Sequence, residues 1–523
     1  METERHPQRR WVSLAVLCAS LLLVGMDLTV LHVAVPTISQ QLLPSGSELL
    51  WIVDGYALTV AAGLITCGTL GDRFGRKRML MTGFAVFGLA SLAAALSDGP
   101  LQLIAARAAL GVGGAMIMSS TPAIIRGLFP DDRERSVAVG LWVSAYSVGV
   151  SVGPLLGGAL IEHFWWGSVF LVNLPIVLVA LVAGVLLIPE SKNPRPHRWD
   201  GASAVLSALG LAAVVYGFQK LGEGSGSGSA VLTWSVLVAG LGLSAAFVIR
   251  QRRISNPLVD LSHFADRRFT LASLCTMVCY GSYAALLFLL TQRLQLADGY
   301  SPLEAGLALT PLAVANAVGA AFAPRFSARF GHRHGLSGGL LLLAAAMAAF
   351  GVFGAGGNYP ALIAAGLGSG AVMTLGSDIM LSSARPERAG EVGALQETSF
   401  SLGAGLGLAF LGTTMSLVYR STFKTVPEAT DAQAESARTS LGAASEVAAR
   451  VGGEVGDALL ESARKSFDTG FTVATTLSAA ALALLGVVAA VGLRKEQTHS
   501  GPSEPSAAKE RDGENVSAES RPE

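Results

Sequence analysis

Long apolar stretches separated by short polar turns cover almost the whole chain. Fourteen of them reach the ~17–25 residues that an α-helix needs to cross a bilayer. They lie near residues 11–36, 49–71, 79–97, 101–125, 136–160, 168–188, 201–219, 230–249, 269–292, 304–324, 336–354, 359–382, 393–419 and 468–493. This pattern predicts an all-α membrane protein with fourteen transmembrane helices.

The positive charges in the turns predict an orientation, because Lys and Arg in short loops stay on the cytoplasmic side. With the N-terminus inside, the inside segments hold the clustered cations, from Arg5, Arg9 and Arg10 to the last pair at 494–495. The short outside turns hold only Lys220 and Arg293. We therefore expect a multi-pass protein of the bacterial cytoplasmic membrane, with the N- and C-termini both cytoplasmic.

Three segments depart from the alternation of helix and short turn. Residues 420–467 form a long outside loop, and we expect an amphipathic helix or hairpin there. Its apolar residues recur at near-helical spacing: Leu441, Val447, Val451, Val455 and Leu459. Residues 494–523 are polar and predict a disordered cytoplasmic tail, and the Gly/Ser run at 222–229 predicts a flexible turn.

Composition supports the membrane class. The 523 residues are 51% hydrophobic and 14% charged, with a mean hydropathy of +0.52, whereas a soluble domain carries about 25% charge. The four cysteines lie in apolar segments, where they predict packing and no disulfide or metal site. No phosphate-binding loop of an ATP-driven pump is present, no basic domain predicts nucleic-acid binding, and no motif predicts an enzyme.

A weak internal repeat predicts how the helices are divided. The stretch Arg73–Arg78 after the second helix is echoed by Arg329–His334 after the tenth. Two six-helix halves, 11–188 and 269–493, then place both stretches in the same loop of their half. The remaining parts are the N-terminal segment 1–10, linkers 189–200 and 250–268, and an inserted helix pair at 201–249.

Four ionisable residues stand out within the predicted helices: Asp27, Asp54, Arg107 and Glu397. Such groups cost roughly 2.5–3.5 kcal/mol each at membrane depth and mark function by default. Carboxylates suit proton coupling and also attract lipophilic cations, and both roles stay open here. Asp54 lies close enough to its helix end that an interfacial position is an alternative, and His32 lines the pore or packs between helices.

The turn after the second helix, GTLGDRFGRKRML, carries the most specific short motif. It has the pattern GxLxDRxGRK and resembles the signature loop of major facilitator superfamily transporters. The resemblance implies that Asp72, with Arg73 and Arg76, latches the two halves in one state. The glycines of the motif are Gly68 and Gly75. A purely orienting cation cluster is the alternative, although it leaves Asp72 and Gly75 unexplained.

Three further stretches resemble the fourteen-helix drug:proton antiporters of that superfamily. Residues Met26–Pro36 are similar to LDxTVxNVALP, with His32 at the usual Asn. Arg107–Gly113 is similar to RxxQGxG, with Leu110 at the usual Gln, and Phe170–Pro175 is similar to FLINVP. In the family, the Arg of the second motif is implicated in proton transfer.

Residues Gly149–Gly158 match GxxxGPxxGG, which is associated with exporters. Gly149, Gly153 and Gly157 share one helix face and permit close backbone approach, while Pro154 removes a backbone hydrogen bond. Gly158 completes the motif. Tight packing with no bearing on transport direction is the alternative.

The resemblance implies a major facilitator fold of two six-helix halves plus two inserted helices. The implied function is proton-coupled efflux of hydrophobic, cationic drugs or antiseptics, with Asp27, Asp54 and Glu397 in cation recognition and proton coupling. The proton-motive force would drive it without a cofactor. The expected partners are the small substrate, protons and lipid, the protein acting as a monomer without nucleic acid. Some relatives carry a further acid at Asn316.

Two alternatives remain beside this function. One is a dedicated exporter for a single antibiotic. The other is a non-transporting membrane sensor, which is disfavoured because no segment can supply a soluble output domain.

Overall fold

The structure is a computed structural model that describes residues 7–44, 46–191, 200–222, 227–254, 257, 259, 261–354, 358–383, 389–426, 429–438 and 440–493. The predicted tail at 494–523 lies outside these residues. The side chains of His32, Asp54 and Pro154 also lie outside the described part, although their backbones belong to helices.

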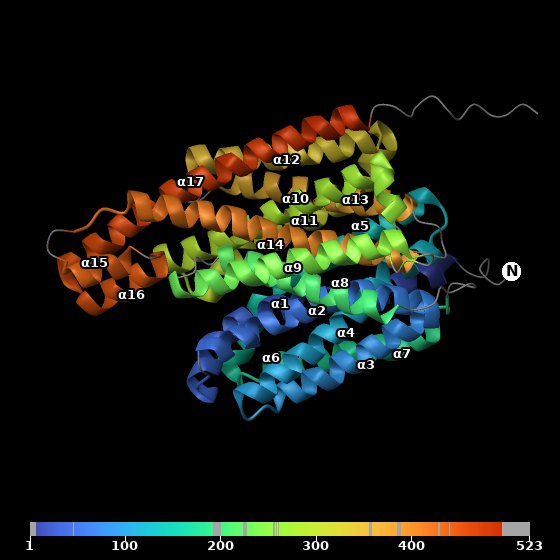
Figure 1. Ribbon diagram of the computed structural model, residues 1–523, viewed down its shortest axis with the longest axis horizontal. Helices are drawn as coiled ribbons and strands as arrows, with labels where there is room; N and C mark the ends of the chain where they lie inside the picture. Colours follow the sequence, from blue (N-terminus) through green and yellow to red (C-terminus); the bar gives the residue numbers. More distant parts are fainter. Residues whose placement is uncertain are drawn as a thin grey trace, which may run out of the picture.

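Long helices run side by side along one axis (Figure 1). The first half contains α1 (Pro7–Leu42), α2 (Gly46–Phe74), α3 (Arg76–Ala95), α4 (Pro100–Leu128), α5 (Asp132–His163), α6 (Ser168–Leu171) and α7 (Asn173–Leu187). An inserted pair follows, α8 (Gly201–Gly222) and α9 (Ser227–Arg253). The second half contains η1 (Leu261–Ala265), α10 (Arg267–Gln292), η2 (Arg293–Ala297), α11 (Pro302–Phe330), α12 (His332–Phe353), α13 (Tyr359–Ser383), α14 (Ala389–Thr422), α15 (Asp431–Ala437), α16 (Leu441–Val451) and α17 (Gly453–Gly492).

Each of the fourteen predicted spans falls on a helix, and the described residues contain no strand. Thirteen helical stretches of the described part are long and apolar enough to cross a membrane. The sixth span is divided at Val172 into α6 and α7. The second span corresponds to α2, in which several side chains are undescribed. The prediction of an all-α membrane protein is confirmed.

The two halves repeat the same packing. In the first, α1 packs on α5 and α2 on α4; in the second, α10 packs on α14 and α11 on α13. The echoed turns also share their backbone conformation, since Gly75 and Gly331 both have positive φ, at 116° and 85°. A positive φ favours glycine because it has no Cβ. The repeat seen in the sequence is therefore a structural repeat.

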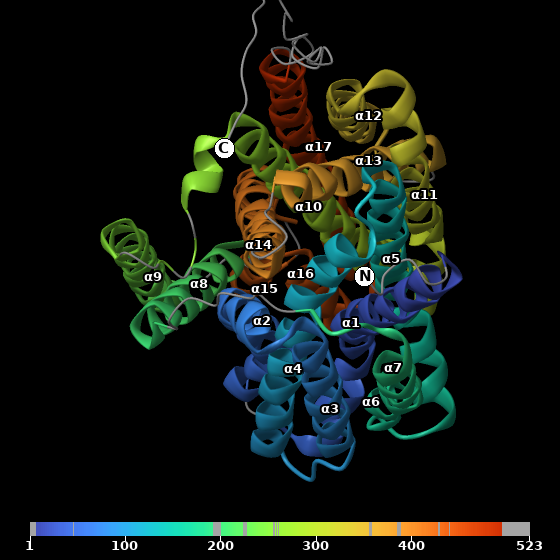
Figure 2. The ribbon, with the colours of Figure 1, turned by 90° about the vertical axis from the view of Figure 1, so that its right-hand side faces the viewer.

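The halves meet through α5 against α11 and α13, and through α14 against α2 and α4. Figure 2 looks along the bundle from the end that carries the α2–α3 and α11–α12 turns. We call this the basic end. The start of α1 and the end of α17 lie there too, since Arg10 pairs with Glu134 and Gly492 packs beside Arg267.

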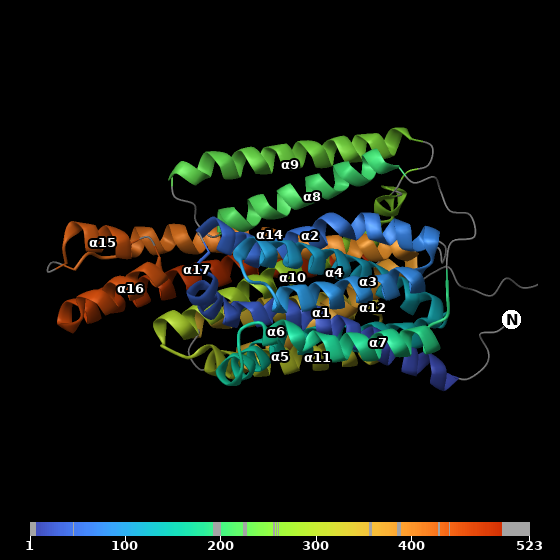
Figure 3. The same ribbon diagram turned by 90° about the horizontal axis from the view of Figure 1, so that it is seen from below.

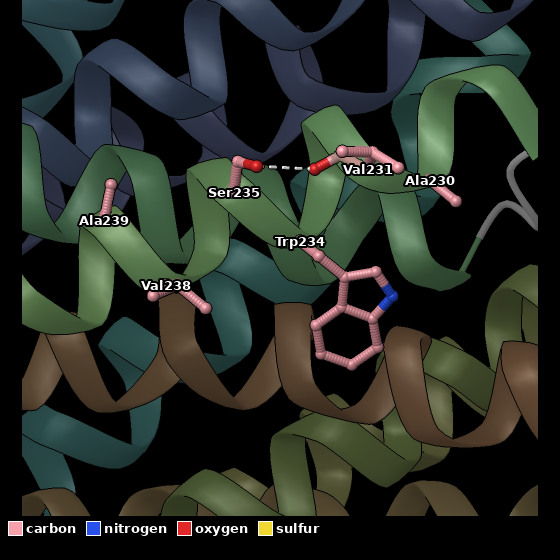
Figure 4. Close-up of a pocket in the computed structure, with 6 residues that line it drawn as sticks. All are labelled: Ala230, Val231, Trp234, Ser235, Val238 and Ala239. Carbon is pink, nitrogen blue, oxygen red and sulfur yellow. Dashed lines mark hydrogen bonds between the residues drawn. The ribbon is translucent and has the colours of Figure 1, made fainter.

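The inserted helices α8 and α9 lie outside the two halves (Figure 2). Helix α8 contacts α2 and α14, and α9 packs on α8. Arg250 of α9 pairs with Asp200 at 2.9 Å, and hydrogen bonds from Ser203 and Arg250 hold the pKa of Asp200 below its usual range. Figure 4 shows a shallow groove on α9 around Trp234, which is half exposed.

The long loop predicted at 420–467 contains the amphipathic hairpin, but the predicted start of the last helix was wrong. Helices α15 and α16 extend past the bundle at the end opposite the basic end (Figure 3). Helix α17 begins at Gly453, well before the predicted start at 468. Its buried Leu459, Ala463 and Phe467 continue the apolar face of the membrane span without a break in phase. The predicted turn at 222–229 is also shorter, because α9 begins at Ser227.

Candidate transport site

Asp27 and Arg107 form an ion pair in the interior of the first half. Arg107 Nη1 lies 2.9 Å from Asp27 Oδ2, and the two side chains are 1% and 0% exposed. They come from α1 and α4, which are far apart in sequence. A charged pair without water is stable only when its geometry is good and its remaining hydrogen-bonding groups are satisfied. The predicted residues are thus brought together as one unit.

The second helix completes the surroundings of Arg107. Arg107 Nε donates to the backbone carbonyl of Ile52 at 3.1 Å. The guanidinium lies 4.8 Å from the centre of the Tyr56 ring, in range of a cation–π interaction. Because Asp54 lies between these two residues on α2, its backbone is close to the site, while its side chain is outside the described residues.

Asn173 is a member of this site to which the sequence assigned no role. Its Nδ2 donates to Asp27 Oδ1 and to Ser91 Oγ, each at 3.0 Å. All three side chains are fully buried. The sequence could have marked Asn173 as a site residue, because it is a polar residue within the predicted span 168–188 and within the motif Phe170–Pro175.

The glycines of α5 position the part of α1 that carries Asp27. A Cβ on Gly149 would lie 2.2 Å from the Leu22 carbonyl, and a Cβ on Gly153 would lie 2.8 Å from the Met26 carbonyl. Gly157 faces Val30, whereas a Cβ on Gly158 would meet nothing within 4 Å. Three of the motif glycines therefore seat α1 tightly against α5, around the turn that holds the acid.

We expect Gly153→Ala to reduce the stability of the folded protein by about 1–3 kcal/mol, as overpacking does. The methyl group would collide with the backbone of α1, which must shift together with Asp27. The measurement is thermal unfolding of the detergent-solubilised protein. Gly158→Ala is the matched control and should unfold as the wild type does. Equal behaviour of the two variants would contradict the packing role.

Glu397 lies on α14 and is 2% exposed. No ion pair to it is found among the described residues. Tyr146 of α5 and Tyr280 of α10 join their hydroxyls at 3.2 Å across the two halves. The Phe400 ring lies 5.2 Å from that of Tyr280. One acid and three aromatic rings thus gather where the halves meet.

Asp72 joins the two halves at the basic end. Its Oδ1 pairs with Arg76 at 2.8 Å, and its Oδ2 accepts from the backbone N–H of Glu391 at 3.2 Å. Glu391 is the third residue of α14, so the carboxylate satisfies a free donor at a helix N-terminus. Gly68 lies buried in α2, and the exposed Arg73 lies against Phe74.

A second contact between the halves lies at the same end. Arg135, in the first turn of α5, is buried and bonds Asp378 of α13 at 3.2 Å and Ser382 at 2.7 Å. His332 approaches the other oxygen of Asp378 at 3.4 Å. Arg135 is one of the cations in the predicted inside turn between spans 101–125 and 136–160, and the sequence assigned it only an orienting role, so this contact was missed.

Asn316 lies in a third contact between the halves, near the middle of the bundle. It accepts from Ser147 of α5 and donates to Ser369 of α13 at 2.7 Å. A buried amide here therefore links the halves.

Comparison with known proteins identifies the family to which this arrangement of helices belongs. The sequence profile of the Major Facilitator Superfamily matches residues 17–408. The chain belongs to this superfamily. It is a multi-pass transporter, and two six-helix halves with an inserted pair are its fold. Solved superfamily structures agree in fold. One is the human organic anion transporter MFSD10, with a TM-score of 0.57, 16% identity and coverage of 91% of this chain and 100% of that one.

Three curated relatives match this chain over nearly its full length. The multidrug efflux pump LfrA of Mycolicibacterium smegmatis is 38% identical over 94% of this chain and 97% of its own. The methyl viologen resistance protein SmvA of Salmonella typhimurium is 35% identical, with 94% and 99% covered. The tetracenomycin C resistance and export protein of Streptomyces glaucescens is 32% identical, with 94% and 92% covered.

Proposed function

We propose that this transporter exports lipophilic cations across the bacterial cytoplasmic membrane in exchange for protons. The observation that carries the proposal is the buried Asp27–Arg107 pair. A buried ion pair is costly to desolvate, and ionisable residues at membrane depth mark functional sites by default. Asp27 is the group that takes up and releases the proton, and Arg107 is its counter-charge.

Export is supported by the relatives, whose names describe efflux, resistance and export. The charges of the turns support an orientation for the protein. The basic end carries the cation-rich α2–α3 and α11–α12 turns, so it faces the cytoplasm under the positive-inside rule. The contacts of Asp72 and Arg135 then close the cytoplasmic side in the state described here.

Cationic substrates are supported by the group around Glu397. A carboxylate with Tyr146, Tyr280 and Phe400 offers both charge and aromatic faces to a flat cation. The group lies between the halves, where alternating opening of the halves can expose it to either side of the membrane. SmvA is named for resistance to methyl viologen, which is itself a cation.

The test is ethidium efflux from energised cells that express the protein, with and without a protonophore. We expect efflux that the protonophore abolishes. Efflux that ignores the protonophore would contradict proton coupling.

Glu397→Gln should raise the KM for ethidium about tenfold or more with little change in protein level. A tenfold change in KM corresponds to a loss of only about 1.4 kcal/mol of binding free energy. The attraction between a cation and a carboxylate in a poorly solvated site is larger than this. Tyr280→Phe keeps the aromatic face and is the matched control, so its KM should change much less. An unchanged KM in Glu397→Gln would exclude this acid from cation binding.

A second candidate, a dedicated exporter of one antibiotic, is favoured by the similarity to the tetracenomycin C protein. A resistance panel separates the two. Protection against several unrelated cations supports the broad exporter, and protection against a single antibiotic supports the narrow one.

A further inference from the structure

The amide of Asn173 occupies a position that depends on the charge of Asp27. Its nitrogen lies 3.0 Å from both Asp27 Oδ1 and Ser91 Oγ. The Asn173 oxygen has no hydrogen-bond partner in the described part of the chain. An amide nitrogen carries two hydrogens, so each neighbour receives one.

An ionised Asp27 permits only this orientation. A carboxylate accepts hydrogen bonds and cannot donate. If the amide were turned, its oxygen would face the carboxylate oxygen without a hydrogen between them. The ionised acid therefore holds the nitrogen of Asn173 toward itself.

A protonated Asp27 makes the opposite demand. Its O–H must find an acceptor, and the guanidinium of Arg107 has none to offer. Rotation of the Asn173 amide by about 180° about its terminal torsion, which is a soft one, would bring its oxygen to the place of its nitrogen. That oxygen could accept from Asp27. Ser91 fits both orientations because a hydroxyl both donates and accepts.

We infer that Asn173 is the positioning residue of the Asp27 carboxyl, and that its amide rotates between two hydrogen-bonded orientations as Asp27 gains and loses a proton. Ser91 is the partner in both. The inference rests on the proposed function in one respect, since Asp27 must take up a proton. Asn173 thereby keeps the buried carboxyl hydrogen-bonded in both protonation states, and it couples α7 and α3 to the state of α1.

Infrared difference spectroscopy of the full-length protein in lipid, recorded between pH steps without substrate, tests the rotation. The expected wild-type spectrum contains a carboxyl C=O band that Asp27→Asn removes. It also contains an amide C=O change at the same pH, which isotope-labelled asparagine shifts and Asn173→Leu removes. In Asn173→Leu the carboxyl band should move to higher wavenumber, because the O–H has lost its acceptor.

Ser91→Ala is the second variant, and it leaves the contact between Asn173 and Asp27 in place. It should keep the carboxyl band and alter the amide band. If Asn173→Leu does not fold, the change of the amide band in Ser91→Ala still assigns that band to Asn173, which lies beside Ser91. A carboxyl band that titrates with no asparagine change would overturn the inference alone. A wild type without an Asp27 band would overturn the inference and the proposed proton site together.

Discussion

Asp27→Asn should abolish protonophore-sensitive ethidium efflux. Asparagine has nearly the same shape as aspartate but cannot bind and release a proton at this position. The neighbouring Arg107 and Asn173 remain in place. Exchange of ethidium across proteoliposomes at equal pH should persist, because exchange requires only the substrate-loaded protein to alternate. The paired measurement of driven efflux and exchange therefore separates lost coupling from lost folding.

The variant also leaves the charge of Arg107 without its partner. Breaking a buried pair in this way costs about 3–5 kcal/mol, which could lower the protein level. The double variant Asp27→Asn/Arg107→Met removes both charges and is the control. It should recover the protein level without recovering driven efflux. Protonophore-sensitive efflux at the wild-type rate in either variant would contradict the role of Asp27.

The helices could be predicted because the apolar length required by a bilayer is a property of each segment alone. Helix ends were less accurate where a helix continues beyond the membrane. Helix α17 is the clear example, since its amphipathic outer part and its apolar inner part share one face. The repeated halves were also predictable, because the echoed turn requires a glycine at the same positive φ.

The site was predictable only in part, because a sequence shows charge but not which charges meet. Asp27 and Arg107 were recognised separately as residues at membrane depth. Their pairing depends on the packing of α1 and α4 and on the glycines of α5. Arg135 lies at a helix start among other cations, so nothing in its neighbourhood distinguished it from them. Its partner Asp378 does lie within a predicted span, and that signal was overlooked.

Asp72→Asn should stop transport while leaving the protein level unchanged. The change removes the charge that faces the N-terminus of α14, and it removes the ion pair between Asp72 and the buried Arg76. A partly buried charge at a helix end contributes up to about 2 kcal/mol. Loss of that amount would lower the ratio of closed to open protein at the basic end by roughly thirtyfold, since 1.4 kcal/mol corresponds to tenfold in an equilibrium constant.

The measurement is the distance distribution between spin labels at positions 78 and 329, which are exposed at the basic end, one in each half. It should shift to longer distances in Asp72→Asn. Asp131→Asn is the matched control, because Asp131 caps the helix α5 through Arg133 and Glu134 of the same helix. That control should keep the wild-type distribution and efflux.

The contact between Arg135 and Asp378 predicts how Asp72→Asn combines with a second change, Asp378→Asn. Arg135 still holds Asp378 when Asp72 is neutral, so Asp72→Asn alone should retain a minor closed population. Adding Asp378→Asn should remove it, since the two contacts lie at the same end and oppose the same opening. A double variant that is no more open than Asp72→Asn would show that Arg135 and Asp378 stabilise the fold of their helices without holding the halves together.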